Sequence, residues 1–93
     1  MKTNKRAEVL GYIRELKKDI LPYLHKDYLA TRKELTEVLS NPDMFDSDIR
    51  SSMITIYRDR YKDKKYIYNF TIEMYHSLRS HLKTLPESNL CEE

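Results

Sequence analysis

Glycine and cysteine are scarce in this chain. There is one glycine, Gly11, and one cysteine, Cys91. Tight turns between strands need glycine or a substitute for it, so this scarcity disfavours a β-rich fold and favours helices with few connections. A lone cysteine cannot form a disulfide within the chain, and it is typical of proteins in a reducing compartment.

Long apolar runs are also missing at the start of the chain. The segment "MKTNKRAEVLGYIRELKK" carries a charge every few residues, which disfavours a signal peptide and a membrane span. Together with the cysteine usage, this predicts a soluble, cytoplasmic protein that does not bind membranes. The formal net charge is +2, which is too small to indicate a polyanionic partner by itself.

Apolar residues recur every three or four positions through the first half of the chain. They are Val9, Ile13, Leu16, Ile20, Leu24, Tyr28, Leu35 and Leu39. This spacing predicts an amphipathic helix over about residues 4–40. Pro22 removes a backbone donor within it, so the helix is kinked or broken there. The apolar stripe keeps its phase across Pro22, which favours a kink.

A connection over residues 41–47 is predicted to separate this helix from a second one. Asn41 precedes a proline and is therefore expected to leave the helical conformation. Asp46 or Ser47 suits the N-cap of a second helix over about residues 48–85, which Pro86 ends. Residues 1–85 then form a single helical domain, and the acidic segment 86–93 is expected to be disordered.

The second helix contains the segment "YRDRYKDKKYIYNF", residues 57–70, in which aromatic and basic residues alternate. A seven-residue repeat places its tyrosines on an inward stripe. The predicted core or oligomer stripe is Ile54, Tyr57, Tyr61, Tyr68, Tyr75, Leu78 and Leu82. Tyrosine suits a thin bundle because its ring can be buried while its hydroxyl reaches water.

The predicted fold is therefore all-α, with two long antiparallel amphipathic helices. Each helix has an apolar arc that is wider than one partner helix can cover. We expect the hairpin to dimerise into a four-helix bundle. The alternative is a compact three- or four-helix bundle, formed by a break at Pro22 with or without a second break near residues 62–65.

Residues suited to catalysis or metal binding do not form a convincing pattern. Glu73 and His76 are three residues apart on a helix, a spacing that also occurs in di-iron bundles, but the extra glutamates such a site needs cannot be identified. There is no glycine-rich loop to hold a phosphate. Cys91 lies beside two glutamates, which disfavour a reactive thiolate. We expect no enzymatic activity, no cofactor and no metal.

The predicted function is a non-catalytic protein–protein interaction module, such as a regulator, an adaptor, or an immunity-type or phage- or plasmid-type inhibitor. Tyr12, Tyr23 and Tyr66 lie off the main stripes and are the predicted partner anchors. The alternative is a nucleic-acid-binding helical bundle that uses the basic segment 58–65. Its candidate residues, which could also contact a protein partner, are Arg58, Arg60, Lys62, Lys64 and Lys65.

Overall fold

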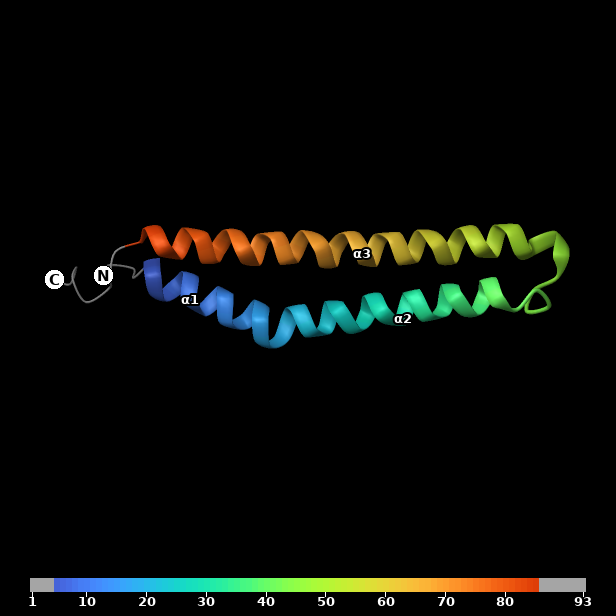
Figure 1. Cartoon of the computed structure of the whole chain (residues 1–93), viewed down its shortest axis with the longest axis horizontal. Helices are drawn as coiled ribbons and strands as arrows, with labels where there is room; N and C mark the ends of the chain where they lie inside the picture. Colours follow the sequence, from blue (N-terminus) through green and yellow to red (C-terminus); the bar gives the residue numbers. More distant parts are fainter. Residues whose placement is uncertain (1–4, 86–93) are drawn as a thin grey trace.

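The chain folds into a long helical hairpin. A computed structural model describes residues 5–85, with α1 at Lys5–Glu15, a π-helical turn η1 at Leu16–Ile20, α2 at Leu21–Ser40 and α3 at Ser47–Thr84. The first three elements follow one another without a gap and form one bent helix, which runs antiparallel to α3 (Figure 1). The prediction of an all-α chain with two long helices, the first of them bent, is confirmed. Residues 86–93, predicted to be disordered, lie outside the described part.

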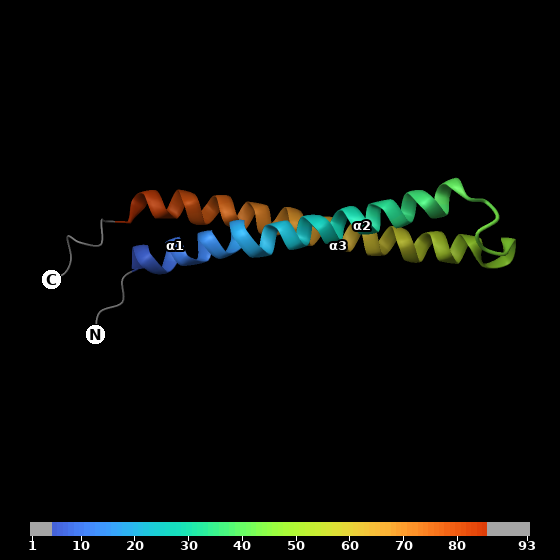
Figure 2. The same cartoon turned by 90° about the horizontal axis from the view of Figure 1, so that it is seen from below.

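The hairpin is elongated. Its described residues span 70 × 21 × 16 Å, and α3 runs unbroken through residues 62–65. The compact alternative is therefore wrong, because the first helix continues past Pro22 without folding back and α3 has no break. Figure 2 shows the two long helices crossing each other at a shallow angle along their length. No proline or glycine occurs within α3, so nothing in its backbone interrupts the helix.

Pro22 is accommodated by the π-helical turn that precedes it. The backbone N–H of Leu21 donates to the carbonyl of Leu16, five residues earlier, and Pro22 follows where its missing N–H is tolerated. A π turn takes up one extra residue, and the bend lies here (Figure 1). Ile20, predicted on the apolar stripe, is 36% exposed because it falls within this turn. That placement was wrong.

A seam of facing side chains runs between the two helices. On the first helix it consists of Val9, Ile13, Leu16, Leu24, Tyr28, Thr31, Leu35 and Val38; on α3 it consists of Ile54, Tyr57, Tyr61, Lys64, Tyr68, Thr71, Tyr75, Leu78 and Leu82. Every one of these residues is buried or half-buried. The seam contains all seven residues of the stripe predicted for the second helix.

The seam corrects the predicted stripe of the first helix at one further position. Val38 is 1% exposed and Leu39 is 47% exposed, so Val38 replaces Leu39 as the last inward residue. Thr31, which falls in the gap of the predicted stripe, is buried, and its hydroxyl donates to the carbonyl of Tyr28 at 2.7 Å. On α3 the buried Thr71 donates in the same way to Ile67 at 2.8 Å. Both hydroxyls are satisfied locally, so burying them leaves no polar group unpaired.

Aromatic rings fill the middle of the seam. Tyr28 stacks against Tyr61 and Tyr68, with ring centroids 5.6 and 5.7 Å apart, and His25 lies 5.1 Å from Tyr68. A hydrogen bond with Tyr61 raises the pKa of Tyr28 above its ordinary value of 10.0, and partial burial adds to this; the positive charges of Lys65 and Arg32 oppose it. Lys65 on α3 and Arg32 on α2 therefore both lie close to this ring.

Arginines tie down the two ends of the hairpin. Arg6 donates to the carbonyls of Leu82 and Leu85 near the end of α3. At the other end Arg50 donates to the carbonyls of Leu39 and Asn41 where α2 ends. Carbonyls at a helix end lack the usual N–H partner four residues later, so a cationic donor helps to satisfy them and suits the helix dipole. The carbonyl of Leu82 also accepts from the N–H of Leu85.

The connection between the helices ends at Asp46, the predicted N-cap of α3. Its backbone carbonyl accepts hydrogen bonds from the N–H groups of Ile49 and Arg50. Its side chain makes no cap hydrogen bond. Phe45 lies 6.3 Å from the ring of Tyr57 and covers this end of the seam.

Candidate functional site

The seam divides the surface of the hairpin into two flanks. On each helix, residues that directly follow a seam residue lie on one side, and residues that directly precede one lie on the other. Because the helices are antiparallel, the residues that follow seam residues lie on the same side of the hairpin in both helices. The residues that precede seam residues share the other side. The ion pair between Arg60 and Glu34, which are 3.4 Å apart, shows this for two preceding residues. The seam residue Lys64 reaches toward the same side, where it lies 2.8 Å from Asp27.

One side, which we call the basic flank, consists of the residues that follow seam residues. On the first helix these are Leu10, Arg14, Lys17, His25, Leu29, Arg32, Thr36 and Leu39, and on α3 they are Thr55, Arg58, Lys62, Lys65, Asn69, Ile72, His76, Arg79 and Lys83. None of these positions holds Asp or Glu. Lys65 and Arg32, which come from different helices, both act on Tyr28. The basic flank is thus one surface shared by both helices.

The other side, which we call the acidic flank, consists of the residues that precede seam residues. On the first helix these are Glu8, Tyr12, Glu15, Tyr23, Asp27, Ala30, Glu34 and Glu37, and on α3 they are Met53, Ile56, Arg60, Asp63, Ile67, Phe70, Met74, Ser77 and His81. The acids come mainly from the first helix, and the apolar residues come from α3. The small net charge of the chain therefore conceals two sides of opposite character.

The predicted basic segment 58–65 is divided between these surfaces. Arg58, Lys62 and Lys65 lie on the basic flank, and all three are exposed. Arg60 lies on the acidic flank, where it pairs with Glu34 and covers the ring of Tyr57 at 5.1 Å.

Lys64 lies in the seam. A hydrogen bond to Asp27 raises the pKa of Lys64, and the negative charge of Asp27 adds to this. The segment is therefore not one continuous basic surface, and residues outside it complete the basic flank.

A row of exposed apolar side chains runs along the acidic flank of α3. We call it the outer stripe: Ile49, Met53, Ile56, Ile67, Phe70 and Met74. Five of these six are between 40% and 55% exposed, and Met53 is half-buried. Arg60 and Asp63 occupy the two central positions of the same row. The spacing of the row alternates between four and three residues, as the seam does, so α3 presents a second apolar row with no covering helix in the described chain.

The sequence contained the signal for the outer stripe. The repeat that placed Ile54 and Tyr61 inward also places Ile56, Ile67 and Phe70 in one neighbouring row. The sequence alone predicts that Ile67, Phe70 and Met74 widen the inner stripe of the second helix. In the structure they form a separate row, because the narrow first helix covers only the seam.

The predicted partner anchors are strongly exposed. Tyr12 is 58%, Tyr23 is 66% and Tyr66 is 71% exposed. Tyr12 and Tyr23 lie on the acidic flank, while Tyr66 lies on the back of α3 and stacks on Phe70 with ring centroids 6.2 Å apart. Tyr66 therefore borders the outer stripe. The role of all three as anchors stays a prediction.

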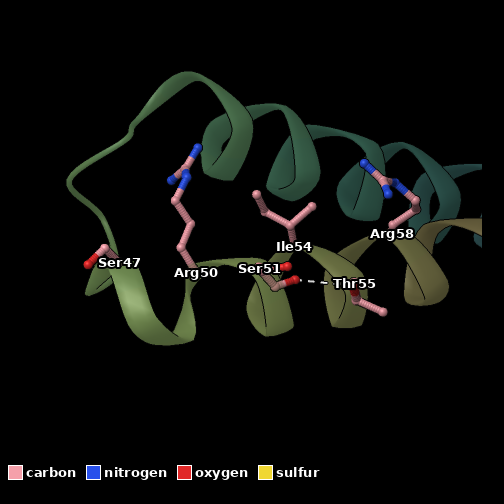
Figure 3. A pocket seen from close by; sticks show the side chains of 6 residues that line it. All are labelled: Ser47, Arg50, Ser51, Ile54, Thr55 and Arg58. Atoms are coloured by element: carbon pink, nitrogen blue, oxygen red, sulfur yellow. Dashed lines mark hydrogen bonds between the residues drawn. The ribbon is translucent and has the colours of Figure 1, made fainter.

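An open hollow of about 430 Å³ lies at the loop end of the basic flank. It is lined by Ser47, Arg50, Ser51, Ile54, Thr55 and Arg58, all from the first turns of α3. Figure 3 shows Arg50 and Arg58 extending toward the ribbon of α2, with the small hydroxyl side chains between and beside them. Arg50 is held by the end of α2, whereas Arg58 makes no ion pair within the described residues.

Within residues 5–85, no group of three or more His, Cys, Asp or Glu side chains is placed to hold a metal ion. The described helices also include none with the length and apolarity to cross a membrane. In comparisons with known proteins, no family model, no curated protein and no solved structure matched the chain. The function is therefore inferred from the surfaces of the hairpin.

Proposed function

We propose that the protein is a non-catalytic helical interaction module that docks through the outer stripe of α3. The observation that carries this proposal is the second apolar row on α3, exposed along the acidic flank. A helix that presents apolar residues at alternating steps of three and four is suited to packing against another helix. Regulators, adaptors and inhibitors of this size can act through such a surface without catalysis.

The hairpin has a physical reason to use the outer stripe. Within the described residues, only Val9, Ile13, Leu16 and Val38 are apolar and buried. A two-helix hairpin of this width encloses little apolar volume, and small domains need additional burial to be stable. Covering the outer stripe would supply a second layer of core.

In this proposal, the partner that covers the outer stripe is a second copy of the chain. The spacing of the row from Ile49 to Met74 is the same in both directions, so two copies of α3 can pack antiparallel about a two-fold axis between Arg60 and Asp63. In that register Ile56 faces the partner copy's Ile67. Met53 and Ile49 likewise meet the partner copy's Phe70 and Met74. This dimer is a four-helix bundle.

The two charges in the centre of the row support this register. Arg60 of one copy would face the partner copy's Asp63, and the same pair would recur on the other side of the axis. Asp63 has no ion pair within residues 5–85. The side chain of Arg60 pairs with Glu34 and is still 47% exposed. A partner without this charge pattern would leave the two groups unmatched at the centre of the contact. The row is thus complementary to itself.

A double variant that places glutamate at two positions of the outer stripe tests the proposal. We expect Ile56→Glu/Ile67→Glu to be a monomer at concentrations where the native chain is a dimer, because the carboxylates would meet an apolar surface and one another. Sedimentation equilibrium measures the mass, and circular dichroism checks that the helices remain.

The matched control is Thr55→Glu/Asn69→Glu, which adds two carboxylates to the same stretch of α3 on the basic flank. Both positions are exposed. We expect this variant to remain a dimer. The proposal would be overturned if the native chain were still monomeric at a protein concentration about 100 times a micromolar Kd. Equal dissociation of both variants would overturn it as well.

A further inference from the structure

We propose that the basic flank binds the phosphate backbone of a double-stranded nucleic acid. This inference goes beyond the docking of the outer stripe, because it uses the opposite side of the hairpin. Two copies that pack through their outer stripes would leave both basic flanks uncovered.

The charge on this surface is uniform. Its Lys and Arg residues are Arg14, Lys17, Arg32, Arg58, Lys62, Lys65, Arg79 and Lys83, and all eight are exposed. None of them makes an ion pair within the described residues. Because no acid lies among them, their positive potential is not cancelled locally and can attract an extended polyanion. Lysine and arginine on helices are common contacts of phosphate oxygens.

The dimensions of the basic flank fit a duplex. From Arg58 to Lys83 the row on α3 covers roughly 37 Å at 1.5 Å per residue, close to the ~34 Å of one duplex turn. A second row of cations runs along the first helix from Arg14 to Arg32. It lies about 8–10 Å from the row on α3, which is the usual distance between packed helices. α3 is straight and unbroken over this length (Figure 1). Two nearly parallel rows of cations are suited to a long, regular phosphate backbone.

The side chains missing from the basic flank favour a duplex over other polyanions. Proteins that bind single strands stack bases on exposed aromatic rings. Here the exposed aromatic residues Tyr12, Tyr23, Tyr66 and Phe70 all lie off the basic flank. The exposed large apolar side chains on this flank are Leu29 and Leu39 among the described residues, and both belong to α2. Over the same described part of the chain, the cationic row of α3 has no exposed apolar anchor of the kind found at the centre of a protein–protein contact.

Membrane binding is disfavoured for a related reason. A helix that binds at a membrane surface combines basic residues with an apolar face that enters the lipid. In this hairpin the outer stripe and the basic flank lie on opposite sides, so they cannot meet the same membrane surface together.

The hollow in Figure 3 provides a position for one phosphate at the end of the flank. Arg58 lies there with Ser51 and Thr55, and hydroxyl groups join arginine in many phosphate contacts. Thr55 donates its hydroxyl to the backbone carbonyl of Ser51 at 3.1 Å, so it would have to turn from that carbonyl to donate to a phosphate. We assign this hollow as the end of the binding surface that lies nearest the loop.

Fluorescence anisotropy with labelled duplexes of about 16 base pairs tests the proposal at about 50 and 200 mM salt. DNA and RNA duplexes both present a phosphate backbone, so titrating each of them separately shows which one the protein binds. We expect Arg58→Gln/Lys62→Gln/Lys65→Gln to weaken binding roughly tenfold or more at the lower salt concentration. We expect it to reduce the slope of log affinity against log salt by about three.

The matched control is Lys18→Gln/Lys26→Gln/Lys33→Gln, which removes the same charge from exposed positions that lie neither on the basic flank nor on the outer stripe. It should keep most of the affinity and of the salt slope. Equal weakening by both triple variants would overturn the assignment of the surface. So would binding to neither duplex at about 50 mM salt, or binding to phosphatidylserine vesicles without binding to a duplex.

Discussion

Lys64 is a charged residue in a seam of apolar and aromatic side chains. Its ammonium group reaches Asp27 at 2.8 Å, and the two side chains are 38% and 30% exposed. The long apolar stem can pack in the seam while the charge extends to its partner at the surface. A lysine at a core position of a coiled coil also restricts the register, so Lys64 and Asp27 help to fix how the helices pair.

This pair predicts a loss of stability at alkaline pH. The pKa of Lys64 is raised above its ordinary 10.5 in the folded chain. Below 10.5 the lysine is protonated in both the folded and the unfolded chain, so its contribution is complete. As pH rises through the folded pKa, the ammonium is lost and the contribution disappears. The raised pKa of Tyr28 acts in the same direction above 10.0, because the unfolded tyrosine ionises first.

Arginine replacements isolate the contribution of Lys64, because a guanidinium stays protonated at these pH values. Urea unfolding from neutral pH to beyond 10.5 should show a smaller alkaline loss in Lys64→Arg than in the native chain. Lys65→Arg makes the same change on the exposed basic flank, where no carboxylate pairs with it, and should follow the native curve. Identical curves for all three proteins would show that the pair with Asp27 does not contribute.

At the scale of the element, the π turn explains why the seam continues past Pro22. Leu16 and Leu24 are eight residues apart, one more than the seven that a regular repeat requires. Without compensation, Leu24 would rotate away from α3 and Tyr23 would take its place. The extra residue is absorbed in the π turn, so Leu24 is half-buried and Tyr23 is exposed.

Deleting Asp19 and replacing proline in the same chain should restore a regular helix. In the double variant ΔAsp19/Pro22→Ala, Leu21, which is already half-buried, would keep a place between Leu16 and Leu24 in a regular helix. We expect the free energy of unfolding to rise by about 1–3 kcal/mol, because the backbone donor that proline lacks is regained without the π turn. Urea unfolding at a fixed protein concentration measures it.

The single variant Pro22→Ala is the control for this prediction. It restores a backbone donor but keeps the extra residue, so we expect a smaller gain. If the double variant were less stable than the native chain, the π turn would be contributing contacts that a regular helix cannot replace.

The two helices and the bend could be predicted from the sequence, because apolar spacing and proline act locally. Tyr57, Tyr61 and Leu78 were placed on the seam by their repeat alone. Ile20 and Leu39 were misplaced, because a π turn and a one-residue change of phase depend on packing against α3. A seven-residue repeat does not distinguish a wide single stripe from two separate ones.

The candidate surfaces were less predictable for the same reason. Arg58 and Arg60 are adjacent members of one basic segment in the sequence, yet they lie on opposite flanks. Their separation follows from the seam, which is defined only when both helices are in register. Arg32 and Lys65 share the basic flank only because the helices pair antiparallel, which no local pattern contains.

At the scale of the whole molecule, the hairpin is a rod with two dissimilar sides. The basic flank carries positive charge from both helices, and the acidic flank combines carboxylates of the first helix with the outer stripe of α3. In the proposed dimer, one side associates with a second copy while the other remains accessible. We propose that the outer stripe pairs with itself, antiparallel, about the axis between Arg60 and Asp63.

A charge exchange between two single variants tests this claim most directly. In Arg60→Asp the new aspartate would face the partner copy's Asp63, and in Asp63→Arg the new arginine would face the partner copy's Arg60. Like charges at the centre of the contact should leave each variant monomeric by itself.

Sedimentation equilibrium of an equimolar mixture of the two variants is the decisive measurement. In the antiparallel register every central contact of the mixed pair joins an acid to a base, so the account predicts that a heterodimer forms from two monomeric variants. A mixture that stays monomeric while the native chain is a dimer would contradict the register. Single variants that dimerise as well as the native chain would contradict the outer stripe as the interface.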